Sequence, residues 1–156
     1  MINNIIKRIL VPIDGSLYSR RALSEAIKIA KKTNAKIYVV TVVDTSEYPP
    51  GMMLALLQKD KRLEESIARF VTAAKSQVRK ELLADVAICK SKGIDANYDI
   101  LIGSPVESLL KFTRGRKMDL IVIGSQGLRG IKKIKTLGSV SRKISELAQC
   151  PVMIVH

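Results

Sequence analysis

Two glycine-containing segments near the end of the chain have the composition of a phosphate-binding site. Gly124-Ser-Gln-Gly127 is followed by Gly138-Ser139, and ten residues, 128–137, separate the second glycine from the third. Glycine lets backbone N–H groups approach an anion closely because it has no Cβ atom. A helix N-terminus adds unpaired N–H donors and a partial positive charge. The sequence therefore predicts phosphate binding at these two segments.

The neighbouring residues place the glycines between a strand and a helix. Residues 119–124 (Asp-Leu-Ile-Val-Ile-Gly) form a short, β-branched apolar run that is typical of a buried parallel strand. Residues 138–147 begin with Gly-Ser and favour a helix that starts at a serine cap. The hydroxyl groups of Ser139 and Ser141 are thus candidates either for phosphate contact or for capping the helix.

The rest of the chain alternates between strand and helix patterns. We expect strands over residues 7–13, 36–43, 97–102, 119–124 and 151–155. We expect helices over residues 16–32, 59–91 and 106–114, and from residue 138 onward. This alternation predicts an α/β fold: an open, parallel, five-stranded sheet with helices on both faces. Ligands of such sheets bind beyond the carboxyl ends of the strands, where the strand order reverses.

Length and composition favour one cytoplasmic domain. A chain of 156 residues with 47% hydrophobic content is long enough to bury a core. No apolar run approaches the roughly 18 residues needed to span a bilayer, and no signal-peptide pattern precedes the first strand. Membrane attachment is therefore not expected. Cys89 and Cys150 form no metal-binding or redox spacing, which favours a reduced, cytoplasmic protein.

The net charge of +13 is unusual, and it is unevenly distributed. Ten basic residues and a single acid, Asp119, lie within residues 111–143. This segment is a solvated basic surface, an attractor of a polyphosphate or an attractor of nucleic acid. Lys132, Lys133 and Lys135 in particular either contact phosphate or are simply solvated. Nucleic-acid binding is not expected, because four Tyr, two Phe and no Trp offer few base-stacking platforms.

Five segments, taken in order, resemble the universal stress protein family over nearly the whole chain. They are Ile9-Leu-Val-Pro-Ile-Asp14-Gly-Ser, Val39-Val-Thr-Val-Val-Asp44, Gly103-Ser-Pro105, the two glycine segments with the strand before them, and Cys150-Pro-Val-Met-Ile-Val155. The resemblance implies a single domain of this family over residues 1–156. It also implies a flavodoxin-like, Rossmann-like sheet of strand order 3-2-1-4-5.

In nucleotide-binding members the resemblance implies ATP in the cleft, with or without Mg. By position, Pro12 would help to form the wall beside the base, and Asp14 would meet the ribose or the adenine. Val42 would present its main chain to the adenine, and Gly124 would lie against the ribose. The alternative for Asp14 is a cap for the helix that starts near Ser16.

The phosphates would be held by Gly127, Gly138 and the hydroxyls of Ser139 and Ser141. One departure from the family pattern falls here, because the family has nine residues between the second and third glycines and this chain has ten. Gly130 could absorb the extra residue in a bulge. Otherwise the loop would be displaced and phosphate affinity would be lost.

These observations favour a small ATP-binding regulatory protein of the stress response over an enzyme. The chain has no Walker motif and no nucleophile elbow, and its only histidine, His156, is the last residue. At most, slow ATP hydrolysis is expected. An adenylyl-transferring enzyme would need a glycine-rich loop after the first strand, where residues 13–17 contain one glycine. The main alternative is a member that binds no nucleotide and acts as a dimeric interaction module.

The last expected strand favours a homodimer. Residues 152–155 (Val-Met-Ile-Val) are apolar and uncharged, which would leave an aggregation-prone edge if the strand were unpaired. Pairing with its own copy across a two-fold axis satisfies that edge, and the family resemblance also implies a dimer formed through the last strand.

Overall fold

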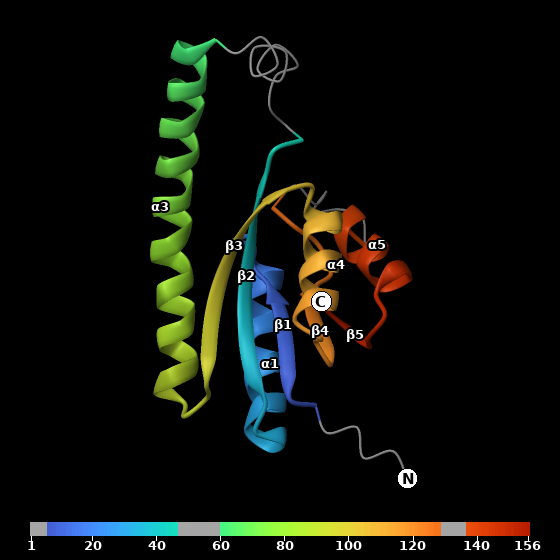
Figure 1. The fold of residues 1–156 in the computed structure, drawn as a ribbon. Coiled ribbons are helices and arrows are strands. Elements are labelled where there is room, and N and C mark those ends of the chain that lie inside the picture. Colours follow the sequence, from blue (N-terminus) through green and yellow to red (C-terminus); the bar gives the residue numbers. More distant parts are fainter. Residues whose placement is uncertain (1–5, 47–59, 129–136) are drawn as a thin grey trace.

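The structure, a computed structural model, describes residues 6–46, 60–128 and 137–156 (Figure 1). Its strands are β1 (Arg8–Pro12), β2 (Lys36–Asp44), β3 (Ala96–Gly103), β4 (Leu120–Gly124) and β5 (Val152–Val155). Its helices are α1 (Leu17–Thr33), α3 (Lys61–Ser91), α4 (Pro105–Gly115) and α5 (Ser139–Leu147). These bounds agree with the predicted elements to within one or two residues at most ends.

The five strands form one parallel sheet in the order β3-β2-β1-β4-β5, which confirms the predicted fold class and strand order. From β1 the chain adds β2 and β3 on one side and then β4 and β5 on the other. The strand order therefore reverses between β1 and β4, and this is the place where an open parallel sheet leaves a crevice at its carboxyl edge.

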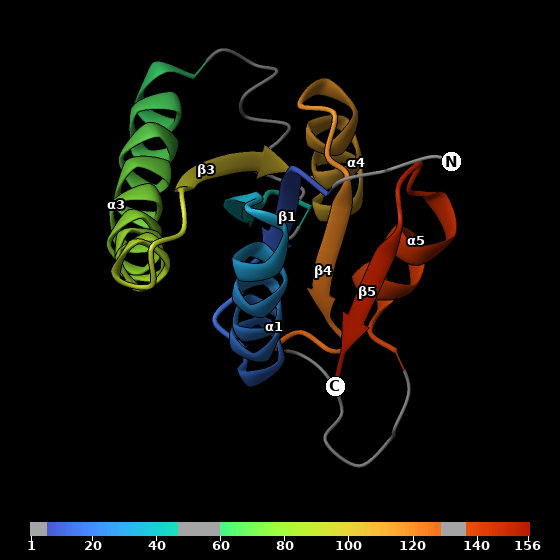
Figure 2. The same ribbon diagram turned by 90° about the horizontal axis from the view of Figure 1, so that it is seen from below.

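Helices cover both faces of the sheet, as predicted (Figure 2). Helices α1 and α3 pack on one face, and α4 and α5 pack on the other. The central strands are apolar on both sides because each face is buried. In β1, for example, Ile9 and Val11 belong to the core under α1 and α3, whereas Leu10 belongs to the core under α4 and α5.

The helix ends follow from local sequence. Ser16 caps α1, since its hydroxyl accepts a hydrogen bond of 3.1 Å from the Ser19 N–H. Helix α1 ends at Asn34, whose φ of 59° lies in the left-handed region that asparagine tolerates. Pro105 occupies the first turn of α4, where its missing N–H costs nothing.

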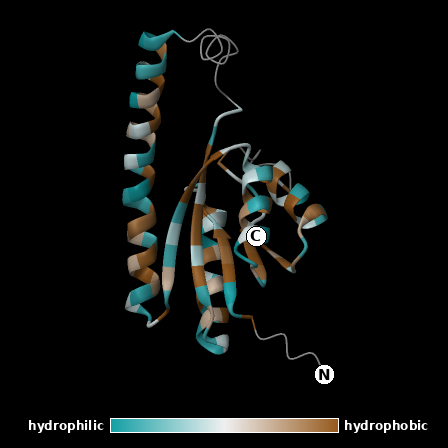
Figure 3. Cartoon of the chain, in the orientation of Figure 1, coloured by the Kyte–Doolittle hydropathy of each residue, from teal (hydrophilic) through white to brown (hydrophobic). Residues whose placement is uncertain are grey.

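Helix α3 is long, and only part of it packs against the sheet. Its buried residues are Leu82, Val86 and Cys89, all in the last third of its 31 residues. The N-terminal part extends beyond the end of the sheet (Figure 1), and Figure 3 shows that its residues alternate between hydrophilic and hydrophobic.

Among the described residues, no helix combines the length and apolar character needed to cross a membrane.

The end of β4 lies so close to α1 that only glycine fits there. A Cβ atom at Gly124 would stand 2.7 Å from the carbonyl carbon of Tyr18 and 2.9 Å from the backbone nitrogen of Ser19. These atoms belong to the backbone of α1, which cannot move as a flexible side chain would. The small size of Gly124 thus has a packing reason inside the fold.

We predict that Gly124→Ala lowers the free energy of unfolding by about 1–3 kcal/mol, the usual range for overpacking. Gly115→Ala is the matched control, because a Cβ atom there would meet nothing within 4 Å. That control should leave stability unchanged or raise it slightly. Urea unfolding monitored by circular dichroism measures both variants, and equal stabilities would contradict the packing argument.

Cys89 is completely buried on the face of α3 that packs against the sheet. Burial, together with the nearby Asp85 carboxylate, raises the pKa of the Cys89 thiol to about 11, from an ordinary value of 9.0. In the unfolded chain the thiol ionises first, so its stabilising effect is complete below pH 9 and is lost as pH rises towards 11. The difference in unfolding free energy between the wild type and Cys89→Ala should therefore shrink over this interval. A difference that stays constant from pH 8 to about pH 11 would contradict the assignment.

Candidate functional site

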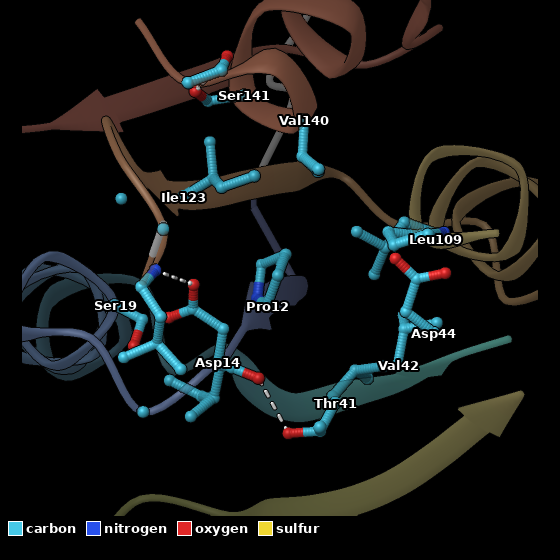
Figure 4. A pocket seen from close by; sticks show the side chains of 18 of the residues that line it. Pro12, Asp14, Ser19, Thr41, Val42, Asp44, Leu109, Ile123, Val140 and Ser141 are labelled. Carbon is cyan, nitrogen blue, oxygen red and sulfur yellow. Dashed lines mark hydrogen bonds between the residues drawn. The ribbon is translucent and has the colours of Figure 1, made fainter. Parts of the chain in front are cut away.

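A cleft of about 520 Å³ lies at the carboxyl edge of the sheet, where the strand order reverses (Figure 4). Segments after β1, along the end of β2 and after β4 line it, together with the start of α5. The structure brings together all eight residues that the sequence analysis selected: Pro12, Asp14, Val42, Gly124, Gly127, Gly138, Ser139 and Ser141. These residues are spread over 130 positions of the chain, so the parallel topology is what assembles them.

Asp14 joins the two corners on either side of the cleft. Its Oδ1 atom accepts a hydrogen bond of 2.9 Å from the Ser16 N–H, and its Oδ2 atom accepts one of 3.2 Å from the Leu128 N–H. The first bond closes the turn that leads into α1; the second reaches across to the loop after β4. The helix cap itself is Ser16 rather than Asp14. Each carboxylate oxygen keeps a further lone pair that a ligand hydroxyl can use.

Gly127 makes this bridge possible. A Cβ atom at Gly127 would stand 2.7 Å from Asp14 Oδ2, which is too close for any other residue without a shift of the loop or the carboxylate. The sequence analysis explained the glycines by the approach of a ligand. The structure adds a reason internal to the protein for Gly127, as it does for Gly124.

The N-terminus of α5 faces the cleft and carries unused donors. Ser139, Val140 and Ser141 form the first turn of α5, whose N–H groups have no intrahelical partner, and no side chain caps them. All three residues line the cleft. Within the described part of the chain their N–H groups have no acceptor, so they form a site for an anion.

The two serines of this turn differ in what they can offer. The hydroxyl of Ser141 is almost completely buried and lies 2.9 Å from the Ser125 carbonyl oxygen, to which it donates. The N–H of Gly138 donates to the same carbonyl at 2.8 Å. Ser139 is exposed, and its hydroxyl is available. Ser125, which the sequence analysis did not select, thus anchors this turn.

The main chain of Val42 is directed into the cleft. The β1–β2 ladder ends at the pair Pro12–Val40, and the Val40 carbonyl accepts a hydrogen bond of 2.8 Å from the Ile13 N–H. Backbone groups in a strand alternate in direction, so Val42 points its N–H and C=O to the same side as Val40. Strand β1 has ended at this level, which leaves both groups of Val42 for a ligand.

Apolar side chains surround this backbone and shape a slot for a flat ring. Figure 4 shows Pro12 between Asp14 on one side and Asp44 on the other. Further apolar lining comes from, among others, Val42, Leu109, Ile123 and Val140. Leu109, Ile123 and Val140 have no distinctive local pattern in the sequence, because they also fit the ordinary core positions of their helices and strands.

The charged side chains of the described lining are all acidic. They are Asp14, Asp44 and Glu81, of which Glu81 comes from α3. An anion in this cleft is therefore bound by backbone amides rather than by the described side chains. Lys132, Lys133, Lys135 and Gly130, which the sequence analysis considered for phosphate contact, lie outside the described residues. No group of three or more potential metal ligands occurs in residues 6–46, 60–128 and 137–156.

Comparison with solved structures shows where this fold recurs. The structure of the hypothetical protein MJ0577 superposes with a TM-score of 0.83, at 22% sequence identity, and covers 97% of this chain and 96% of that chain. At this identity the likeness concerns the fold. A universal stress protein crystallised in complex with cAMP superposes with a TM-score of 0.66 at 27% identity, over 97% of this chain and 98% of its own.

Comparison of sequences gives the family. The universal stress protein MJ0531 of Methanocaldococcus jannaschii is 32% identical over 152 residues, which are 97% of this chain and 83% of that protein. The profile of the universal stress protein family matches residues 6–156. This chain belongs to the universal stress protein family.

Proposed function

We propose that this protein binds an adenine nucleotide, ATP with or without Mg, in the cleft at the carboxyl edge of the sheet. The observation that carries the proposal is that one cavity combines two kinds of site. An apolar slot with free main-chain groups lies at Val42, and an uncapped helix N-terminus lies at Ser139. A nucleotide has a flat base with polar edges and a negatively charged phosphate chain, which match these two sites.

Each part of the nucleotide has a partner in this arrangement. The adenine would lie against Pro12 and exchange hydrogen bonds with the Val42 main chain. The ribose would lie near Gly124 and donate from its hydroxyls to Asp14, while the phosphates would meet Gly127, Gly138 and the first turn of α5. The hydroxyl of Ser139 would add a contact; Ser141 would act mainly by holding the turn, since its own hydrogen is already donated.

A related protein supports the ligand class. The relative that was crystallised in complex with cAMP covers nearly the same length and is 27% identical. We infer from this relative, and from the cleft itself, that adenine is the base. The proposed role is regulatory, since the described cleft holds no histidine, lysine or cysteine that could act as a base or nucleophile.

The competing function is an interaction module without a nucleotide. The observation that favours it is the acidic lining of Asp14, Asp44 and Glu81, which repels phosphate unless the amides or a cation offset it. Calorimetry separates the two functions. We expect a heat of binding with ATP in the presence of Mg. If no heat is observed at high protein concentration, with and without Mg, the interaction module becomes the supported function.

Ser139→Pro tests the amides of α5 directly. Proline is well tolerated at the first helical position, and Gly138 before it already has the extended conformation (φ −62°, ψ 158°) that proline requires. The substitution therefore removes one N–H donor with little effect on folding. We predict that it weakens ATP binding by about tenfold or more, the usual value of a hydrogen bond to a charged group.

Two controls identify the cause of that loss. Ser139→Ala removes the hydroxyl but keeps the N–H, and it should weaken ATP binding less than Ser139→Pro does. Adenosine lacks phosphates, so its affinity should be the same for the wild type and Ser139→Pro. If Ser139→Pro binds ATP as tightly as the wild type, the phosphates are not at this helix.

We also propose a homodimer formed through β5. The carbonyls of Pro151 and Val155 accept hydrogen bonds from β4 and the residue after it, so the intervening Val152 and Ile154 point their main-chain groups to the outer edge. Within the described residues β5 pairs only with β4. The strand has no charge, and Met153 is 38% exposed beside the open edge.

We predict that Met153→Lys shifts the protein towards monomer in sedimentation velocity experiments. A lysine on an edge strand opposes strand pairing, and two copies would face each other near the two-fold axis. Leu83→Lys on the exposed surface of α3 adds the same charge away from β5 and should leave the dimer intact. A wild-type protein that is monomeric at micromolar concentration would contradict the proposal.

A further inference from the structure

The edge of the sheet opposite the cleft gathers basic side chains from separate parts of the sequence. In a parallel sheet the strands begin, and the crossover helices end, at the same edge. The ten Lys and Arg residues at this basic edge are Lys7, Arg8, Lys31, Lys32, Lys36, Lys90, Lys92, Arg114, Arg116 and Lys117. The cleft and its acidic lining lie at the other end of the strands.

Few carboxylates offset these charges. Asp95, Asp99, Asp119 and Glu146 lie at or beside the basic edge, which leaves an excess of six positive charges. In the described part of the chain, two ion pairs form here: Lys36 to Asp95 at 3.2 Å and Arg116 to Asp99 at 3.8 Å. Asp119 is occupied by backbone, because its Oδ2 accepts the N–H groups of Lys7 and Arg8 at 2.9 and 2.8 Å.

The helix dipoles explain only some of these cations. Lys31, Lys32, Lys90 and Arg114 lie in the last turns of their helices, where a positive charge is stabilising. Lys7 and Lys36 lie at strand starts rather than in a helix, whereas Arg8 Nη1 donates at 3.0 Å to the carbonyl oxygen of Arg116, the C-cap residue of α4.

Lys117 directly follows the C-cap of α4, where the helix dipole favours a cation, but it carries a conformational cost. Its φ of 51° lies in the left-handed region, which costs lysine more than glycine. A residue type chosen only for folding at this turn would be glycine or asparagine. The basic edge therefore carries an excess of positive charge that its carboxylates do not offset.

We propose that the basic edge binds the phosphate backbone of duplex nucleic acid without reading its sequence. A five-stranded sheet is about 20 Å across, since neighbouring strands lie about 4.8 Å apart. The basic edge is therefore wide enough to contact several phosphates of a duplex at once. All of the ten cations except the half-buried Lys36 are exposed. One of them, Arg114, has a planar guanidinium group that can pair with a phosphate through two hydrogen bonds.

The same surface is less suited to other polyanions. Single strands are usually bound by exposed aromatic rings, but the nearby Tyr38 and Phe112 are packed against the core. Membrane binding usually adds a continuous apolar patch. The exposed apolar residues at this edge, Ile88 and Leu147, lie on helices at opposite sides of the sheet.

The test uses a labelled 20-base-pair DNA duplex and fluorescence anisotropy over a range of salt concentrations. The variant Lys31→Gln/Lys90→Gln/Lys117→Gln removes three exposed cations from three separate places on the basic edge. The matched control Lys61→Gln/Lys75→Gln/Lys80→Gln removes three exposed lysines from α3 with the same change in net charge. Circular dichroism and urea unfolding check the folding of both variants, and neither should differ much from the wild type because all six lysines are exposed.

We expect the basic-edge variant to bind the duplex at least tenfold more weakly at low salt. The slope of log K against log salt should also fall in magnitude by up to about 3, close to one for each phosphate that the variant no longer neutralises. The control should bind about threefold more weakly at most. Equal weakening in the two variants would show attraction by net charge alone and would overturn the proposal. Tighter binding to phosphatidylserine vesicles than to the duplex would overturn it in favour of a membrane surface.

Discussion

The carboxylate of Asp14 holds together the two corners between which the cleft opens. Its two oxygens accept N–H groups from Ser16 and Leu128, which follow different strands of the sheet. A Cβ atom at position 127 would force the Asp14 carboxylate or the loop to shift, and the position of β4 beside α1 requires glycine at position 124. A single arrangement of one acid and two glycines therefore fixes the distance between the β1 corner and the β4 corner. The shape of the cleft depends on that distance.

The chemistry of the cleft follows from backbone rather than from side chains. At one end the N–H and C=O of Val42 face the side on which β1 has ended, although β2 still pairs with β3 on its other side. At the other end the first turn of α5 has no side-chain cap. These groups cannot be removed by ordinary substitutions, which makes the site tolerant of sequence change. The acidic side chains around these backbone groups repel phosphate. Binding of a nucleotide would therefore rest on geometry that presents several amides at once.

The sequence was sufficient for the fold, and the eight residues selected from it line one cleft. Alternating apolar runs and helix patterns predicted the five strands, and the family resemblance supplied their order. The segments after β1 and β4 were found because glycine and aspartate stand out there.

Glu81 and Val78 of α3 were missed, because only tertiary packing carries a helix of ordinary amphipathic sequence to the rim of the cleft. The basic edge was missed for the same reason: its cations are scattered along the sequence and meet only where strands begin and helices end. The internal roles of Gly124 and Gly127 depend on distances to residues more than 100 positions away.

An amide NMR titration of the protein with ATP tests the central claim most directly, because it reports each backbone N–H separately. The account predicts the largest chemical-shift changes at Val42, Ser139 and Val140, with little change at Lys7 and Lys117 on the opposite edge. ATP is itself a polyanion, so the basic edge is the other place on this protein where it could bind. Changes concentrated at Lys7, Lys117 and their neighbours, with Ser139 and Val42 unaffected, would show that the nucleotide is attracted to the basic edge and that the cleft does not bind it.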